Sequence, residues 1–237
     1  MLLIFIWLWL KYLIIIPKTV YINYLIYNYA VGDSMKKKFL LFADNTIKKK
    51  YPSISNDEIE IINYGLESVY LTITKLLIIL LLSVILGITD KVLLILIFYN
   101  IIRITAFGLH ASKSIYCLIS SCLFLIGGVF ICEFINISFP LKVIMSFVCI
   151  ICIYLYAPAD THKRPLINKK KRKIYKTISL LSSVIYSILI VVYNESVISS
   201  YLLFSMIIAV MMILPFTYKV FNMPYNNYKT YDYGLEG

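Results

Sequence analysis

One histidine and one cysteine have the types and the spacing to form a catalytic pair. His110 follows Gly108 at a break between two apolar runs, and Cys117 lies at the start of the second run. An imidazole that removes the proton of a thiol makes the sulfur a nucleophile, and a helix N-terminus also favours a thiolate. On a continuous helix the two groups would be about 10 Å apart, so the chain must fold back near Gly108. The spacing alone leaves open an interfacial histidine beside a buried cysteine.

The remaining four cysteines and the second histidine do not form a comparable histidine–cysteine pair at a break between apolar runs. Cys122, Cys132, Cys149 and Cys152 lie inside apolar runs, where cysteine behaves as a small hydrophobe. They do not indicate a disulfide framework. His162 is the only other histidine, and no ligand motif with metal-site spacing accompanies it. We therefore expect neither a metal nor a cofactor.

The composition predicts the elements that hold this pair. Of the 237 residues, 61% are hydrophobic and 15% are charged, which excludes an ordinary water-facing surface. A membrane-spanning helix needs roughly 20 apolar residues. Suitable runs occupy residues 70–88, 92–106, 115–134, 141–156, 174–193 and 197–214. The sequence therefore predicts an all-α, polytopic membrane protein with about six transmembrane helices and short helical hairpins.

The distribution of basic residues predicts the topology. The net charge is +11, but the basic residues form clusters beside apolar runs, which is typical of membrane orientation and anionic-lipid contact rather than nucleic-acid binding. If the clusters at 36–38, 48–50 and 163–176 share one side with Arg103, Lys113 and the tail residues Lys219 and Lys229, the loops on the other side contain only Lys91 and Lys142. We expect a multi-pass protein of the cell membrane with both termini and the His110 loop in the cytoplasm.

The segment before the first run has a helix start signal. Ser55 and Glu58 fit a capping box, and apolar residues follow at helical spacing. This predicts either an amphipathic helix on the membrane surface or an extension of the first span.

The sequence divides into four parts. They are a hydrophobic N-terminal extension (1–34), a cytoplasmic or interfacial segment (35–69), a six-helix membrane domain (70–215) and a cytoplasmic tail (216–237). Met35 is followed by three lysines, and Gly32-Asp33 can be encoded by a ribosome-binding sequence. We therefore expect translation to start at Met35.

Two motifs resemble the accessory gene regulator protein B (AgrB) family of membrane cysteine endopeptidases. One is RITAFGLHA at 103–111 with Cys117 after it, and the other is APADTHKRP at 157–165. The resemblance extends from about Asp44 to Met212 and includes EIEIINYG at 58–65. Residues 1–34 do not resemble the family.

The resemblance implies a reaction. His110 and Cys117 match the family's catalytic pair, and the family's substrate is an AgrD-type propeptide with an amphipathic helix and an acidic C-terminal tail. Cleavage through an acyl-enzyme thioester and cyclisation would give a thiolactone or lactone quorum-sensing peptide. A homodimer is compatible with the family, although no motif specifies it.

Other residues are candidates for supporting roles, each with an alternative. Asp160 could orient His110, or pair with Lys163 or Arg164. Arg103 could contact an oxyanion or the substrate tail, or only mark the membrane boundary. A basic run could bind the acidic tail or only set the topology; it comprises Lys169, Lys170, Lys171, Arg172 and Lys173.

Two other functions remain as alternatives. A small-solute transporter is disfavoured because no charge lies deep in the last four predicted spans, where a coupling site would need one. A non-catalytic peptide-binding membrane protein differs from the endopeptidase in that it would not depend on the Cys117 thiol.

Overall fold

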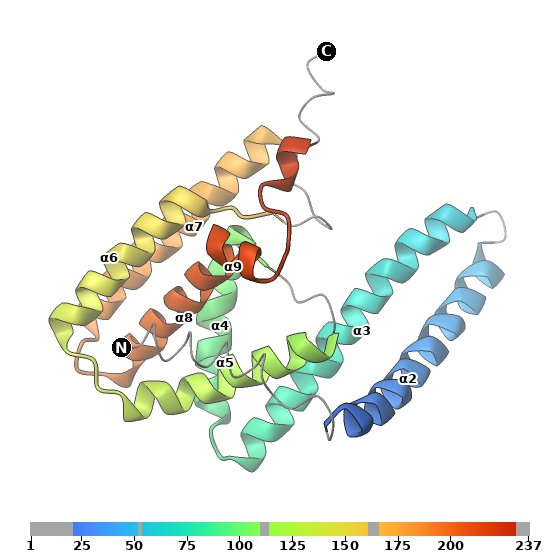
Figure 1. The fold of residues 1–237 in the computed structure, drawn as a ribbon, viewed down its shortest axis with the longest axis horizontal. Coiled ribbons are helices and arrows are strands. Elements are labelled where there is room, and N and C mark those ends of the chain that lie inside the picture. The colour runs from blue at the N-terminus through green and yellow to red at the C-terminus, as the bar shows by residue number, and fades with distance from the viewer. Residues whose placement is uncertain (1–20, 52–53, 110–113, 161–165, 231–237) are drawn as a thin grey trace. The chain divides into compact units, whose positions relative to one another are not determined.

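The computed structural model describes residues 21–51, 54–109, 114–160 and 166–230, and in this part of the chain it is helical without strands (Figure 1). His110 lies outside the described residues, as do His162, Lys163 and Arg164. The elements are α2 (Tyr21–Lys50), α3 (Asn56–Ile85), α4 (Thr89–Ala106), α5 (Ser114–Phe134), α6 (Phe139–Tyr156), α7 (Lys169–Val192), α8 (Val197–Ile213), α9 (Pro215–Val220) and a 3₁₀ turn, η1 (Asn227–Thr230). The chain divides into two units, 1–74 and 75–237.

The predicted all-α membrane fold is confirmed. Four described helical segments are long and apolar enough to span a membrane: Gly65–Ile85, Cys117–Phe134, Phe139–Tyr156 and Lys169–Val192. The other two predicted spans correspond to α8, an apolar helix of 17 residues, and α4, an 18-residue helix that contains Asp90, Lys91 and Arg103.

In the first unit, α2 packs against the beginning of α3. Phe39 stacks on Tyr70 with ring centroids 5.2 Å apart, and Lys36 forms an ion pair of 2.8 Å with Glu67. α2 continues through Met35.

The capping box predicted before the first span is present. The Ser55 backbone N–H and hydroxyl donate to Glu58 Oε2 at 3.0 and 2.9 Å, and the Glu58 N–H donates to Ser55 Oγ. These bonds, the backbone one foremost, lower the pKa of Glu58. α3 then continues without a break to Ile85, so the predicted amphipathic segment extends the first span.

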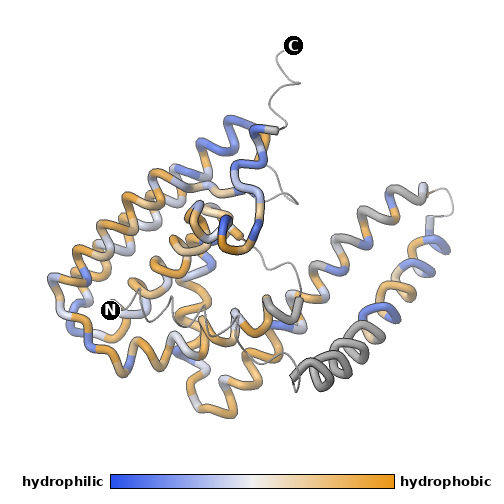
Figure 2. Tube along the Cα trace, viewed as in Figure 1, coloured by the Kyte–Doolittle hydropathy of each residue, from blue (hydrophilic) through white to orange (hydrophobic). Residues whose placement is uncertain are grey.

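In the second unit, α8 is the central helix. It packs against α4, α5, α6 and α7, and most of its residues are buried (Figure 1). A helix that is apolar on all sides is typical of such a position. The other helices of this unit expose large apolar side chains, for example Leu81 of α3, Phe147 of α6 and Ile188 of α7, as expected for a lipid-facing surface. Figure 2 shows hydrophobic residues along the helices and hydrophilic residues at the beginning of α7.

Polar contacts join the helix ends opposite the predicted catalytic end. Lys91 of α4 pairs with Glu133 of α5, which also accepts a hydrogen bond of 3.3 Å from the Tyr201 hydroxyl of α8. The buried Lys142 ammonium donates to Ser199 Oγ at 2.7 Å and to the Asn194 carbonyl at 3.3 Å. Lys91 and Lys142, assigned to one side from the sequence, therefore do lie at the same end of the unit.

Two adjacent glycines of α5 provide a matched test of the α5–α8 packing. A Cβ on Gly128 would collide with the buried Phe204 ring, whereas a Cβ on Gly127 would meet no atom within 4 Å. We expect Gly128→Ala to lower the free energy of unfolding by about 1–3 kcal/mol through overpacking. Gly127→Ala should raise it by up to about 1 kcal/mol through helix propensity. Thermal unfolding in detergent measures both, and equal effects at the two positions would contradict the predicted packing.

Candidate active site

The Arg103 side chain binds the backbone of the segment immediately before His110. It lies in the last turn of α4, and its guanidinium donates hydrogen bonds to the carbonyl oxygens of Phe107, Gly108 and Leu109, the bond to Gly108 being 3.0 Å long. Carbonyl groups just beyond a helix lack helical partners, and the planar fork of arginine can bind several at once. Arg103 thereby holds the three residues immediately before His110.

The same loop joins the two sequence motifs. The Gly108 N–H donates to the Ala159 carbonyl at 2.7 Å, and the Ala159 N–H donates to the Ala106 carbonyl at 2.9 Å. The Leu109 N–H donates to the Met212 carbonyl of α8 at 2.9 Å. The segments before His110 and before Asp160 therefore lie side by side as a short parallel bridge.

Only glycine fits at position 108. Its φ is +107°, a region that other residues rarely adopt. A Cβ there would also come within 2.5 Å of the Met212 carbonyl oxygen. The sequence predicts that the chain folds back near Gly108. In the structure, the loop lies against Met212 of α8 at this glycine.

Asp160 is almost fully buried and binds backbone amides. Its carboxylate accepts hydrogen bonds from the N–H groups of Leu166 (3.3 Å), Asn227 (3.1 Å) and Tyr228 (2.7 Å). The Tyr218 hydroxyl donates to the Ala159 and Asp160 carbonyls, both at 3.2 Å. Burial raises the pKa of Tyr218, which keeps its phenol protonated as a donor.

The sequence did not indicate Asn227 and Tyr228 as partners of Asp160, because they lie 67 and 68 residues further along the chain. The partners that the sequence suggested, His110, Lys163 and Arg164, lie outside the described residues. A role for Asp160 in orienting His110 therefore stays a prediction.

Cys117 lies in the first turn of α5 and is partly exposed. Its sulfur accepts a hydrogen bond from the Lys75 ammonium of α3, with Nζ 3.6 Å from Sγ. Lys75 is the partner of Cys117 that the sequence did not indicate: it lies in the first predicted span, close enough to one end for its side chain to reach the membrane boundary, and its position alone suggests no chemical role. A charge within an apolar run was the signal that could have identified it.

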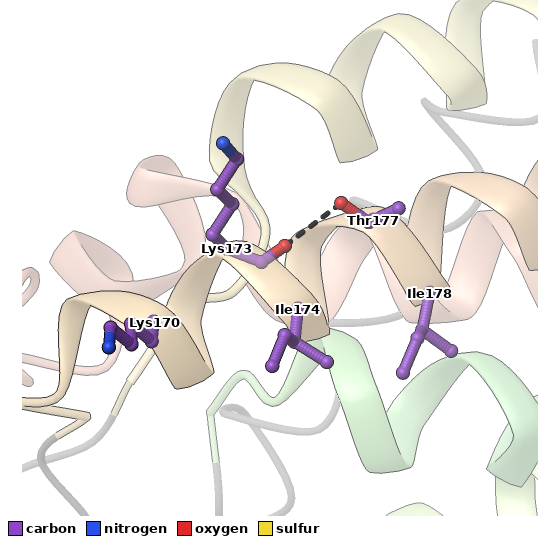
Figure 3. A pocket seen from close by; sticks show the side chains of 5 residues that line it. All are labelled: Lys170, Lys173, Ile174, Thr177 and Ile178. Atoms are coloured by element: carbon purple, nitrogen blue, oxygen red, sulfur yellow. Dashed lines mark hydrogen bonds between the residues drawn. The ribbon is translucent and has the colours of Figure 1, made fainter.

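The basic run at the beginning of α7 has two kinds of side chains. The Arg172 guanidinium stacks on the Tyr228 ring at 3.0 Å from its centroid, and Lys176 lies 4.6 Å from the centroid of Tyr154. Lys170 and Lys173 instead line an open depression of about 460 Å³, whose other residues are Ile174, Thr177 and Ile178 (Figure 3). All four lysines of the run are exposed, and Lys170 and Lys173 are the two that line the depression.

The described residues bring no three His, Cys, Asp or Glu side chains into a cluster that could hold a metal ion.

The Asp160 contacts predict a loss of stability when its charge is removed. Asp160→Asn keeps the shape but weakens three hydrogen bonds to a buried carboxylate, so we expect the free energy of unfolding to fall by about 1.5–3 kcal/mol. Thermal unfolding in detergent measures the change, with the exposed Glu195→Gln as control. Equal unfolding temperatures for the two variants would contradict the assigned role of Asp160.

Comparison with known proteins identifies relatives across most of the chain. An AgrB-like protein of Clostridium acetobutylicum is 28% identical over 184 residues, which cover 77% of this chain and 88% of the relative. An AgrB-like protein of Listeria monocytogenes is 26% identical over 72% of this chain and 84% of the relative. The accessory gene regulator protein B of Staphylococcus aureus is 38% identical over 81 residues, 34% of this chain and 43% of that protein.

No solved structure matches the chain. The model of the family described as Accessory gene regulator B matches residues 43–214. This range contains Cys117, Asp160 and the loop that Arg103 binds. The recognition made from the two sequence motifs is confirmed. The chain is a multi-pass membrane protein that belongs to the accessory gene regulator B family and has a role in the accessory gene regulator quorum-sensing system.

Proposed function

We propose that this protein is a membrane-embedded cysteine endopeptidase that removes the C-terminal tail of an AgrD-type propeptide and cyclises the remaining peptide. The observation that carries the proposal is the arrangement at one end of the helices. The Cys117 sulfur is partly exposed beside a cation, and Arg103 holds the backbone that leads directly to His110. This arrangement suits a nucleophile and a base supplied by separate, firmly positioned segments.

In the proposed reaction, His110 removes the thiol proton and the Cys117 sulfur attacks the carbonyl carbon before the propeptide tail. The new S–C bond moves the carbonyl electron pair to oxygen. When the tetrahedral intermediate collapses, the C–N bond breaks and His110 returns the proton to the leaving amine. The product is an acyl-enzyme thioester and a free tail.

The second half-reaction sets the product. A cysteine or serine side chain of the bound peptide gives its proton to His110 and attacks the thioester carbonyl carbon. The bond to the Cys117 sulfur breaks, His110 returns the proton to that sulfur, and a thiolactone or lactone ring is closed. Water would give a linear peptide instead. Attack within one bound molecule is favoured over attack by solvent, and the partial burial of Cys117 limits access of water to the thioester.

The basic residues at the beginning of α7 are the proposed binding site for the acidic tail. Lys170 and Lys173 line an open depression, whereas Arg172 already stacks on Tyr228. We therefore assign direct tail contact to the two lysines, with Lys169 and Lys171 contributing to the local potential. The positive charge also favours a cytoplasmic orientation of this end and contact with anionic lipids.

Replacement of the nucleophile tests the proposal. Cys117→Ala and Cys117→Ser should abolish cleavage of the propeptide while the protein still inserts into the membrane. The propeptide is taken from a neighbouring short reading frame that encodes an amphipathic helix, a Cys or Ser and an acidic tail. Mass spectrometry of the co-expressed peptide measures cleavage. Cys122→Ala, five residues further along α5, is the matched control and should cleave normally; undiminished cleavage by Cys117→Ala would overturn the proposal.

The Arg103 contacts generate a second prediction. Arg103→Lys retains the charge but loses the fork that reaches three carbonyl groups, so the loop before His110 should lose its position. We expect cleavage to fall about 10- to 100-fold, as for small displacements of reacting groups. Lys91→Arg at the opposite end of α4 keeps its ion pair with Glu133 and serves as control. Wild-type cleavage by Arg103→Lys would show that the carbonyl contacts are not required.

A further inference from the structure

Lys75 is a charged residue within an apolar span. The candidate span Gly65–Ile85 contains it, and its ammonium contacts Cys117, the first residue of the candidate span Cys117–Phe134. Charged residues within such spans are rare, usually face the protein interior or a polar cavity and often have a function. The partly buried position of Lys75 and the direction of its side chain toward α5 fit this pattern.

The partner of Lys75 is the proposed nucleophile. Its ammonium donates to Cys117 Sγ at 3.6 Å, and among the described residues no Asp or Glu carboxylate lies within ion-pair distance of it. Of the five cysteines, Cys117 is the one to which the structure gives a hydrogen bond from a cation. A purely structural lysine in an apolar span would be expected to pair with a carboxylate or with backbone carbonyls.

We propose that Lys75 is a further catalytic residue of the cysteine endopeptidase, which stabilises the Cys117 thiolate and then the oxyanion formed on the attacked carbonyl. The inference rests on the proposed role of Cys117 as nucleophile. The carbonyl oxygen is two bonds from the sulfur once the S–C bond has formed, so a donor that contacts the sulfur can also reach that oxygen. Lysine has three donors on a flexible stem, which allows both contacts in turn.

Lys75 transfers no proton in this sequence. The negative charge begins on sulfur, moves to the carbonyl oxygen as the S–C bond forms, and leaves the oxygen when the C–N bond breaks. His110 carries the proton from the thiol to the leaving amine. A fixed cation placed where charge develops accelerates such a reaction without transferring a proton.

Alkylation of Cys117 tests the contact without any propeptide. In the full-length protein with Cys122, Cys132, Cys149 and Cys152 replaced by alanine, we measure the second-order rate of reaction of Cys117 with iodoacetamide at pH 7.5 in detergent. Lys75→Met should slow alkylation by about tenfold or more, because a nearby cation favours a thiolate. Lys75→Arg should remain within about threefold of wild type. An unchanged rate in Lys75→Met would overturn the inference.

A matched control separates this effect from misfolding. Lys75→Met in a protein whose single cysteine is Cys152, on α6, should leave the alkylation rate and the unfolding temperature unchanged. If Lys75→Met also changes the alkylation rate of Cys152, Lys75 affects the fold as a whole and the catalytic assignment fails.

Cleavage of the propeptide distinguishes failure of this inference from failure of the proposed function. We expect Lys75→Met to reduce cleavage about 100-fold or more, as for loss of an oxyanion donor, and Lys75→Arg to retain part of it. If Cys117→Ala abolishes cleavage but Lys75→Met cleaves normally, the protein is a cysteine endopeptidase and Lys75 is not catalytic. If Cys117→Ala cleaves normally, the proposed function fails whatever Lys75 does to alkylation.

Discussion

The carbonyl groups of Phe107, Gly108 and Leu109 lie just beyond the end of α4, and Arg103 satisfies all three. This contact determines where the chain goes after α4. Because the loop is held by Arg103, its N–H groups can pair with Ala159 and with Met212 of α8. Three helix ends therefore meet at one short stretch of backbone, and His110 is the next residue in the chain.

The two ends of the second unit each contain a lysine with a different kind of partner. Lys142 is bound by a hydroxyl and a carbonyl group, which satisfy its donors as a structural contact would. Lys75 is bound by a sulfur atom, a weak acceptor when protonated and a strong partner when ionised. The difference between these acceptors is the physical basis for assigning structure to one lysine and chemistry to the other.

Local signals in the sequence predicted most of the helices. The ends of α5 and α6 at Phe134 and Tyr156 agree with the predicted runs, because apolar composition ends there. α7 begins at Lys169 instead of 174, since Asn168 caps it by accepting a hydrogen bond from the Lys171 N–H. The partners of Asp160 and Lys75 could not be predicted, because they lie 67 and 42 positions away and depend on how the helices pack.

The Asp160 contacts also have a consequence for biosynthesis. Asn227 and Tyr228 lie beyond the residues that match the family and are translated after every helix of the membrane unit. The carboxylate that supports the bridge between the two motifs therefore gains two of its amide partners only when the ribosome has made this late segment. Until then Asp160 has only the Leu166 amide among these three partners, so the contacts of its carboxylate are completed after the last membrane helix has been made.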